Sequence, residues 1–98
     1  MYNIGMWKIL EHRSIDRKIK KSPKDVQEKY EKWLDIIYQS GPTGLRLIRG
    51  FNDEALQGEW KGFRSSRLSK QYRVIYKVKK KEIVVSVIDV TAHDYRKR

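Results

Sequence analysis

Residues 82–90, EIVVSVIDV, have the pattern of a buried strand. β-branched residues dominate this stretch, and apolar side chains fall on both of its alternating faces, which predicts a central strand covered on both sides. Two more strands are expected before it, at 61–68 and 72–78, and the segments between them, 69–71 and 79–81, are short. Because turns this short join antiparallel neighbours, the second half of the chain is predicted to be a three-stranded meander.

The first half of the chain adds a strand and a short helix. WKILE at 7–11 has the composition of a strand, and residues 14–20 are predicted to form a helix. Ile15 and Ile19 lie four positions apart, so they share the face of that helix that packs on the core. The exposed face of the same helix is strongly basic.

A longer helix follows, with sequence signals at both ends. Ser22 is expected to cap it, Pro23 suits its first position, and Gly41 is expected to end it. Residues 42–60 are predicted to be an irregular connector. The chain, 1–98, is therefore expected to be a single α+β domain in the order β-α-α-β-β-β, with two helices packed on a mainly antiparallel four-stranded sheet.

Composition narrows the functional classes. No apolar run approaches the roughly 20 residues of a membrane helix, and the first residues, MYNIGMWKIL, lack the pattern of a signal peptide. The absence of cysteine excludes disulfides and cysteine-based metal sites, and it is compatible with a cytoplasmic protein. No membrane partner is expected.

The charge is large and unevenly placed. The chain carries a net charge of +11, which predicts association with polyanions. Residues 42–98 hold 14 Lys and Arg against 6 Asp and Glu, a net of +8, whereas residues 1–41 hold 9 against 6, a net of +3. A solubilising surface or an acidic protein partner would also account for such a surplus, so nucleic acid is one of three explanations.

The predicted meander brings polar residues to one edge of the sheet. In an antiparallel meander, the end of the last strand lies beside the start of the middle strand. His93 and Tyr95 are therefore expected close to Arg73, and Arg67 is expected across the short turn from Arg73. Arg64 falls on the opposite face of its strand from Arg67.

These side chains suit metal-independent cleavage of RNA. In that reaction the 2′-hydroxyl attacks the adjacent phosphorus after a base removes its proton, and guanidinium groups stabilise the charge on the phosphoryl oxygens. A histidine can protonate the leaving 5′-oxygen near neutral pH, and an aromatic ring can stack a base. Glu54, in the segment FNDEALQGEW at 51–60, is the best carboxylate for the general base.

The order of elements and the string LQGEWKGFRSSRLSKQYRVIYKV at 56–78 resemble the RelE/ParE superfamily of toxins from bacterial type II toxin–antitoxin systems. The ending AHDYRKR at 92–98 extends the similarity, and the branch it most resembles is the YoeB and YafQ type of mRNA interferase, which cuts mRNA in the ribosomal A site. The resemblance implies a RelE-like, microbial-ribonuclease-like fold without metal or cofactor. It also implies an acidic antitoxin that covers the active site and through which operator DNA is bound.

The resemblance also implies roles for individual residues. In the YoeB-like branch a glutamate is the general base, an arginine stabilises the phosphate and a histidine near the C-terminus is the general acid. These roles fall on Glu54, Arg73 and His93. Arg67 matches a second strand arginine, and Tyr95 corresponds loosely to a tyrosine beside the terminal histidine.

Some features depart from the pattern. YafQ-like members use several histidines, and this chain has only His12 and His93. RelE itself uses lysines and arginines in place of a glutamate–histidine pair. Lys61, Arg64 and Arg67 could serve in the same way here, so this alternative remains open.

The remaining basic residues are expected to hold nucleic acid. RNA contacts are predicted for Lys61, Arg64, Arg96, Lys97 and Arg98. Contacts with rRNA phosphates on the 30S subunit are predicted for the basic helix, at Arg17, Lys18, Lys20 and Lys21. Binding through such contacts weakens steeply with salt.

Each candidate also has a purely structural interpretation. Glu54 could cap a turn or pair with Arg46 or Arg49. Arg73 could pair with Asp89 or Asp94. Trp60 is expected in the core, and the alternative is a platform on which a base stacks. Two other functions also remain open. One is a ParE-like gyrase poison with the same fold and no RNA chemistry, and the other is a non-catalytic module that binds RNA or the ribosome.

Overall fold

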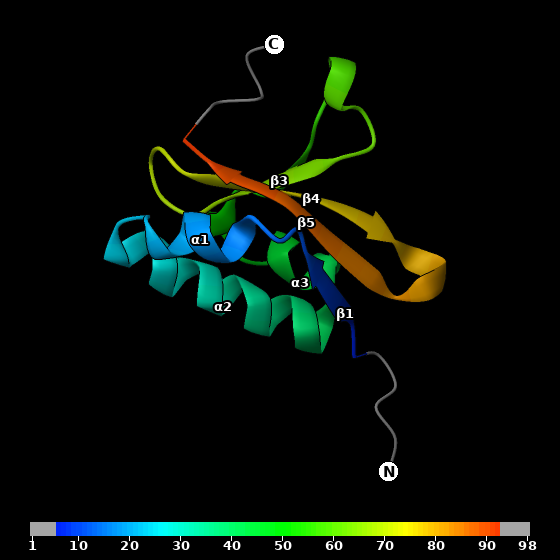
Figure 1. The fold of residues 1–98 in the computed structure, drawn as a ribbon. Coiled ribbons are helices and arrows are strands. Elements are labelled where there is room, and N and C mark those ends of the chain that lie inside the picture. The colour runs from blue at the N-terminus through cyan, green and yellow to red at the C-terminus, as the bar shows by residue number, and fades with distance from the viewer. Residues whose placement is uncertain (1–5, 93–98) are drawn as a thin grey trace.

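A five-stranded sheet organises residues 6–92, which are the residues that the computed structural model describes. Its order is β1-β5-β4-β3-β2, and Figure 1 shows the helices together on one side of it. The strands are β1 (Lys8–Glu11), β2 (Glu54–Ala55), β3 (Arg64–Arg67), β4 (Arg73–Lys79) and β5 (Val84–Thr91). The helices are α1 (Ile15–Lys20), α2 (Lys24–Ser40) and α3 (Pro42–Arg46), and single 3-10 turns span Arg49–Phe51, Gly58–Trp60 and Lys80–Glu82.

Strand β5 lies inside the sheet, as its composition predicts. It pairs in parallel with β1 and antiparallel with β4, and β4 pairs antiparallel with β3. Val85, Val87 and Val90 of β5 are buried in the core. Ser86 and Ile88 remain partly exposed, and the helices lie on one side of the sheet only, so the expected cover on both faces is wrong.

Helix α2 supplies most of the helical half of the core. Val26, Tyr30, Trp33 and Ile37 recur at helical spacing and are all buried. The helix ends at Gly41, as predicted, where the backbone adopts a φ of +74°.

The expected cap at Ser22 is wrong. Its hydroxyl donates a hydrogen bond to the carbonyl of Lys18 at the end of α1 (2.8 Å), and Pro23 occupies the N-cap position of α2. The hydroxyl therefore binds a carbonyl at the end of α1 instead of an N–H group at the start of α2.

The segment expected to be an irregular connector contains regular structure. It holds α3 and a fifth strand, β2, in which Glu54 lies opposite Ser65 and Ala55 lies opposite Arg64. The α+β class predicted from the sequence is confirmed, and the sheet gains one short edge strand. No helix within residues 6–92 combines the length and the apolar character needed to cross a membrane.

Strand β1 pairs with only the first part of β5. Helix α1 lies beside the part of β5 that β1 does not cover. The backbone N–H of His12 donates to the carbonyl of Val87 (3.0 Å), and α1 then runs beside the rest of β5. Lys18 forms an ion pair with Asp89 there (2.5 Å). Ile15 is buried and Ile19 packs against the core, which confirms the predicted inner face of this helix.

Candidate active site

Arg73, the first residue of β4, is an arginine with only 4% of its surface exposed. Its guanidinium donates to the hydroxyl of Ser65 from Nε (2.9 Å) and from Nη2 (2.7 Å). Nη2 also lies 3.2 Å from the carbonyl oxygen of Asn52 and 3.4 Å from Oε2 of Glu54. A buried charge is stable only with such partners, so these contacts fix the guanidinium in one place.

Sheet register explains how the site assembles. Residues directly opposite each other on neighbouring strands project to the same face. Arg67 lies opposite Arg73, as the sequence predicts, and Glu54 lies opposite Ser65. The next residue of β3, Ser66, accepts a hydrogen bond from Trp33 of α2 (2.9 Å), so it faces the helices. The other four residues therefore share the face turned away from the helices, which we call the open face.

Arg67 carries an unusual feature on the open face. Its Nε atom is buried, and it has no hydrogen-bond partner within residues 6–92. A buried donor without an acceptor costs about 1–3 kcal/mol. Arg67 also lies opposite a second guanidinium, that of Arg73, so two like charges are neighbours. An anion on this face would supply the missing acceptor and reduce the repulsion.

Glu54 stands at the rim of the open face on the edge strand β2. Its side chain is 34% exposed, whereas that of Arg73 is 5% exposed. Its contact with Arg73 is long, at 3.4 Å. The carboxylate therefore combines contact with solvent and proximity to a fixed cation, an arrangement compatible with accepting a proton from a bound group.

The end of β5 reaches the same corner of the sheet. Thr91 lies directly opposite Arg73, which confirms that the last strand ends beside the start of the middle strand of the meander. The remaining predicted residues of this corner lie outside the described residues: His93, Tyr95, Arg96, Lys97 and Arg98.

A second arginine–carboxylate pair lies on the helix-facing side of the same strands, and sequence reasoning missed it. Asp53, with no exposed side-chain surface, accepts two hydrogen bonds from Arg64 (2.9 and 2.7 Å) and one each from Ser66 (2.7 Å) and Tyr76. The hydroxyl of Ser66 in turn accepts from Trp33. The only sequence signal was the position of Asp53 next to Glu54 in the connector.

The Asp53 network shifts two pKa values. Burial, and then the negative charge and hydrogen bond of Asp53, raise the pKa of the Tyr76 hydroxyl. Burial acts to lower the pKa of Arg64, but Asp53 outweighs it and the pKa is raised. Arg64 therefore stays charged and bound to Asp53, on the face opposite Arg73.

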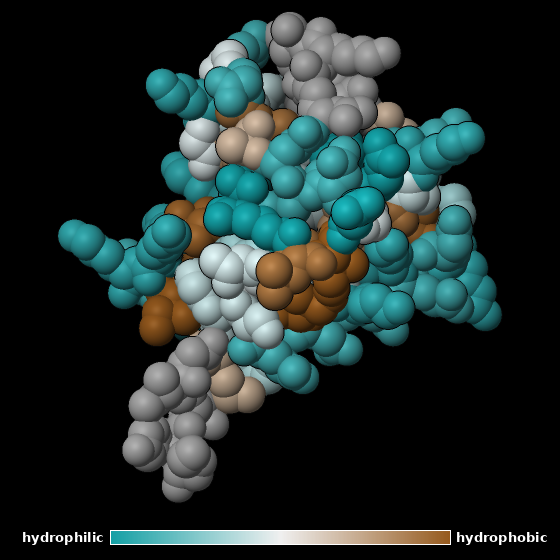
Figure 2. All heavy atoms as spheres, turned by 180° about the vertical axis from the view of Figure 1, so that it is seen from behind, coloured by the Kyte–Doolittle hydropathy of each residue, from teal (hydrophilic) through white to brown (hydrophobic). Residues whose placement is uncertain are grey.

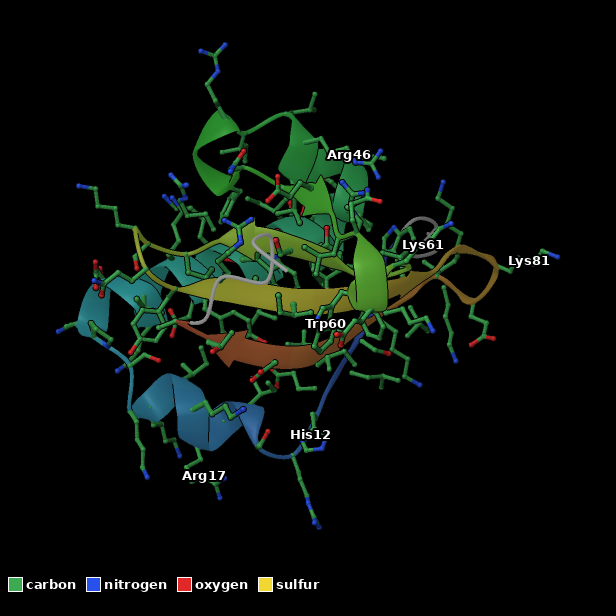
Figure 3. The ribbon with its side chains drawn as sticks, turned by 90° about the horizontal axis from the view of Figure 1, so that it is seen from above. His12, Arg17, Arg46, Trp60, Lys61 and Lys81 are labelled. Carbon is green, nitrogen blue, oxygen red and sulfur yellow. The ribbon has the colours of Figure 1, made fainter. Side chains whose placement is uncertain are left out.

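The aromatic and basic residues of the β2–β3 connection lie apart from the core. Lys61 is exposed, and Figure 3 shows it beside Trp60 at the 3-10 turn. Trp60 is half-buried and lies outside the core cluster, so the interpretation as a core residue is wrong. Its ring meets that of Phe63 edge to face (5.4 Å between centroids), and Lys77 lies over the Phe63 ring (5.4 Å).

Arg17 of α1 lies beyond β5 and well apart from Trp60 (Figure 3). Arg17 and Lys21 are exposed, and Lys20 pairs with Asp16 at 3.0 Å on the surface. Exposed pairs of this kind contribute little to stability. Figure 2 shows the hydrophilic side chains that cover much of the face seen from behind.

Several solved structures share this fold. A chain of the archaeal RelE–RelB complex from Pyrococcus horikoshii superposes with a TM-score of 0.69 at 22% identity, over 95% of this chain and 98% of that chain. The YoeB dimer from Staphylococcus aureus gives a TM-score of 0.69 at 18% identity, over 91% and 99%. The DinJ–YafQ toxin–antitoxin complex of E. coli gives 0.67 at 19%, over 88% and 91%.

These likenesses establish the fold. The chain has the fold of the RelE, YoeB and YafQ toxins, over nearly its whole length and theirs. No protein-family model matches the sequence. No curated protein matches it either.

Proposed function

We propose that this chain is the toxin of a type II toxin–antitoxin system and a ribosome-dependent mRNA endoribonuclease. The fold likeness to RelE, YoeB and YafQ and the net charge of +11 both support this proposal. The observation that carries it is the open face, where Glu54 lies 3.4 Å from the buried guanidinium of Arg73 and Arg67 lies opposite Arg73.

In the proposed reaction, the carboxylate of Glu54 takes the proton of a ribose 2′-hydroxyl. The 2′-oxygen attacks the adjacent phosphorus, and the bond to the 5′-oxygen of the next nucleotide breaks. His93 donates a proton to that leaving oxygen, so the products are a 2′,3′-cyclic phosphate and a free 5′-hydroxyl. Tyr95 stacks on a base and keeps the strand in line for attack.

The two arginines supply electrostatic stabilisation in this scheme. Arg73 is fixed by Ser65 and by the carbonyl of Asn52 before any substrate binds, so no reorganisation is needed when charge develops. The buried Nε of Arg67 gains an acceptor from a phosphoryl oxygen. Removing a preorganised donor of this kind costs about 10²–10³ in rate.

The proposed partners follow from charge. An acidic antitoxin segment would neutralise Arg67 and Arg73, and operator DNA would be bound through that antitoxin. The exposed Arg17 and Lys21, with Lys18 and Lys20, would contact rRNA in the ribosomal A site. Lys61, with Arg96, Lys97 and Arg98, would hold the mRNA backbone, and the protein would act in the cytoplasm.

The proposal is tested by expressing the chain briefly in bacteria and mapping the 5′ ends of one abundant mRNA. A copy of that mRNA without its start codon is the control for translation, and His93→Ala is the control for chemistry. We expect cuts in the translated copy only, and a loss of about 10²–10⁴ in rate for His93→Ala. Cuts in both copies would show a ribonuclease that needs no ribosome.

Intact mRNA in arrested cells would contradict cleavage. Induction of the DNA damage response would then favour the gyrase poison. Ribosome association without cut RNA would favour the non-catalytic module.

A further inference from the structure

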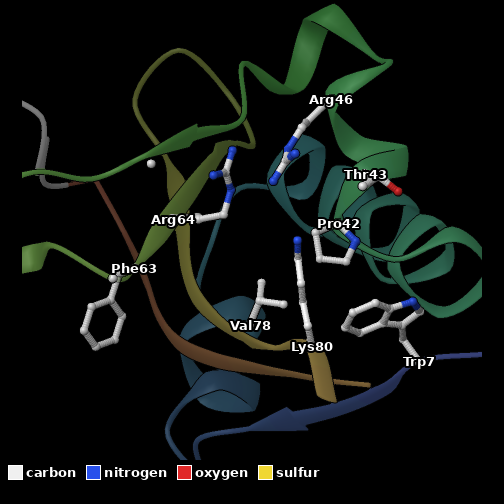
Figure 4. Close-up of a pocket in the computed structure, with 10 residues that line it drawn as sticks. Trp7, Pro42, Thr43, Arg46, Phe63, Arg64, Val78 and Lys80 are labelled. Atoms are coloured by element: carbon white, nitrogen blue, oxygen red, sulfur yellow. The ribbon is translucent and has the colours of Figure 1, made fainter. Parts of the chain in front are cut away.

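A cavity of about 330 Å³ lies between the end of β4, the β2–β3 ladder and helix α3. Trp7, Pro42 and Val78 form apolar walls, and Arg46, Arg64 and Lys80 bring cationic groups to it (Figure 4). Its size falls in the range of about 300–1,000 Å³ that is typical of sites for small molecules.

The cavity is separate from the open face. Ala55 and Arg64 lie opposite each other and line the cavity, whereas the neighbouring pair, Glu54 and Ser65, belongs to the open face. Successive residues of a strand project to opposite sides of the sheet. The charged residue that β3 contributes to the cavity, Arg64, therefore projects to the face opposite Arg73.

The cations that meet at the cavity come from three different elements. Arg46 belongs to α3, Arg64 to β3 and Lys80 to the 3-10 turn after β4. Arg64 is balanced by Asp53, at 2.7 Å. Arg46 and Lys80 are exposed, and neither forms an ion pair within residues 6–92. Two positive charges that converge on one space without a counter-charge favour a ligand with about two negative charges.

The aromatic wall of the cavity is held in place before any ligand binds. The backbone N–H of Trp7 donates to the carbonyl of Tyr38 at 3.1 Å. The indole packs so closely on Gly41 that a Cβ at that position would lie 2.6 Å from Cε2 of Trp7. A fixed indole beside cationic groups is a platform on which a nucleobase can stack.

We propose that this cavity binds one nucleotide, with the phosphate between Arg46 and Lys80 and the base against Trp7. A phosphate monoester carries about two negative charges at one point near neutral pH, which matches the two uncompensated cations. An acidic peptide brings single charges at separate points and no flat ring for the indole. A free nucleotide and the terminal nucleotide of a 5′-phosphorylated RNA strand present the same doubly charged monoester, and binding here does not depend on cleavage at Arg73.

The test follows the indole N–H signal of Trp7 by NMR in the full-length chain at about 150 mM salt, where surface charge effects are strongly screened. One probe is adenosine 5′-monophosphate, and the other is a 5′-phosphorylated, fully 2′-O-methylated RNA hexamer, which cannot be cut by 2′-hydroxyl attack. The pocket variant is Arg46→Glu with Lys80→Glu. Its matched control is Arg49→Glu with Lys81→Glu, which makes the same charge change at neighbouring exposed positions outside the cavity.

We expect the Trp7 signal to shift, and the pocket variant to lose affinity by about ten-fold or more while the control changes less than about two-fold. Binding of the mononucleotide would identify a free nucleotide as a ligand, and binding of the hexamer alone would identify an RNA strand. An equal loss in both variants would overturn the proposal, because general charge would explain it. A Trp7 signal that shifts with neither probe would also overturn it. Neither result depends on whether mRNA is cut.

Discussion

Two arginine–carboxylate pairs lie back to back across the same strands, and they are built from nearly the same residue types. On the helix-facing side, Asp53 has no exposed side-chain surface and accepts four hydrogen bonds. On the open face, the side chain of Glu54 is 34% exposed and lies 3.4 Å from Arg73. Two adjacent residues therefore differ in their surroundings, because Asp53 is bound by residues of β3 and β4 on the helix-facing side and Glu54 is partly exposed on the open face.

The largest effect is expected at the structural pair. Asp53→Asn removes the charge that holds the part-buried guanidinium of Arg64 and replaces an acceptor oxygen with a donor facing Ser66 or Tyr76. We expect the free energy of unfolding to fall by about 3–5 kcal/mol, measured by urea denaturation. A loss below about 1 kcal/mol would show that the network contributes little to the fold.

The next largest effect is expected at the open-face arginine. Arg73→Lys keeps the charge but cannot reproduce the bonds to Ser65 and to the carbonyl of Asn52 together. We expect mRNA cleavage to slow by about 10²–10³ in a translation assay that follows full-length mRNA over time. Arg49→Lys, at an exposed position, is the matched control. Cleavage within about three-fold of wild type would remove Arg73 from the chemistry.

The comparison also shows what the sequence could predict. Alternation along β3 and the short turn to β4 placed Arg67 opposite Arg73, and antiparallel pairing placed the end of β5 beside Arg73. These positions depend only on the alternation of side chains along a strand and on the length of the turns, and both can be determined from the local sequence.

The rest depends on tertiary contacts that no local pattern shows. Strand β2 is two residues long, which is too short for any alternation to be detected. Asp53 and Glu54 are chemically similar neighbours, and only the paired strand β3 decides which face each one meets. Ser22 lies between two helices, and its choice between them depends on how α1 packs beside α2.

A smaller effect is expected at Arg67, where function and stability should change in opposite directions. Arg67→Met removes the buried Nε that lacks an acceptor within residues 6–92, and it relieves the repulsion with Arg73. We expect the free energy of unfolding to rise by up to about 1–3 kcal/mol while cleavage falls by about ten-fold or more. A variant that is less stable than wild type would mean that Arg67 has a structural role.

The smallest effect is expected at alkaline pH, and it concerns the stability contributed by Tyr76 on the helix-facing side. The pKa of Tyr76 is raised in the folded protein, first by burial and then by Asp53, above its unfolded value of about 10. The stability linked to this group is therefore present below pH ~10 and is lost as the pH rises above it. In the wild type, the free energy of unfolding should fall as the pH rises. We expect Tyr76→Phe to make this slope shallower by up to about 1.4 kcal/mol per pH unit, measured by denaturation between pH ~9 and ~11. Tyr38→Phe, at an exposed position, is the control, and identical slopes in the two variants would contradict this role.

We propose that Glu54 serves catalysis while its neighbour Asp53 serves the fold. Glu54→Gln separates the two roles when both its free energy of unfolding and its rate of cleavage of a translated mRNA are measured. We expect stability within about 1 kcal/mol of wild type, because the side chain is partly exposed, and a fall in cleavage of about 10²–10⁴. A variant that is equally stable and cuts at the wild-type rate would contradict the account, because the carboxylate would then take no part in the reaction.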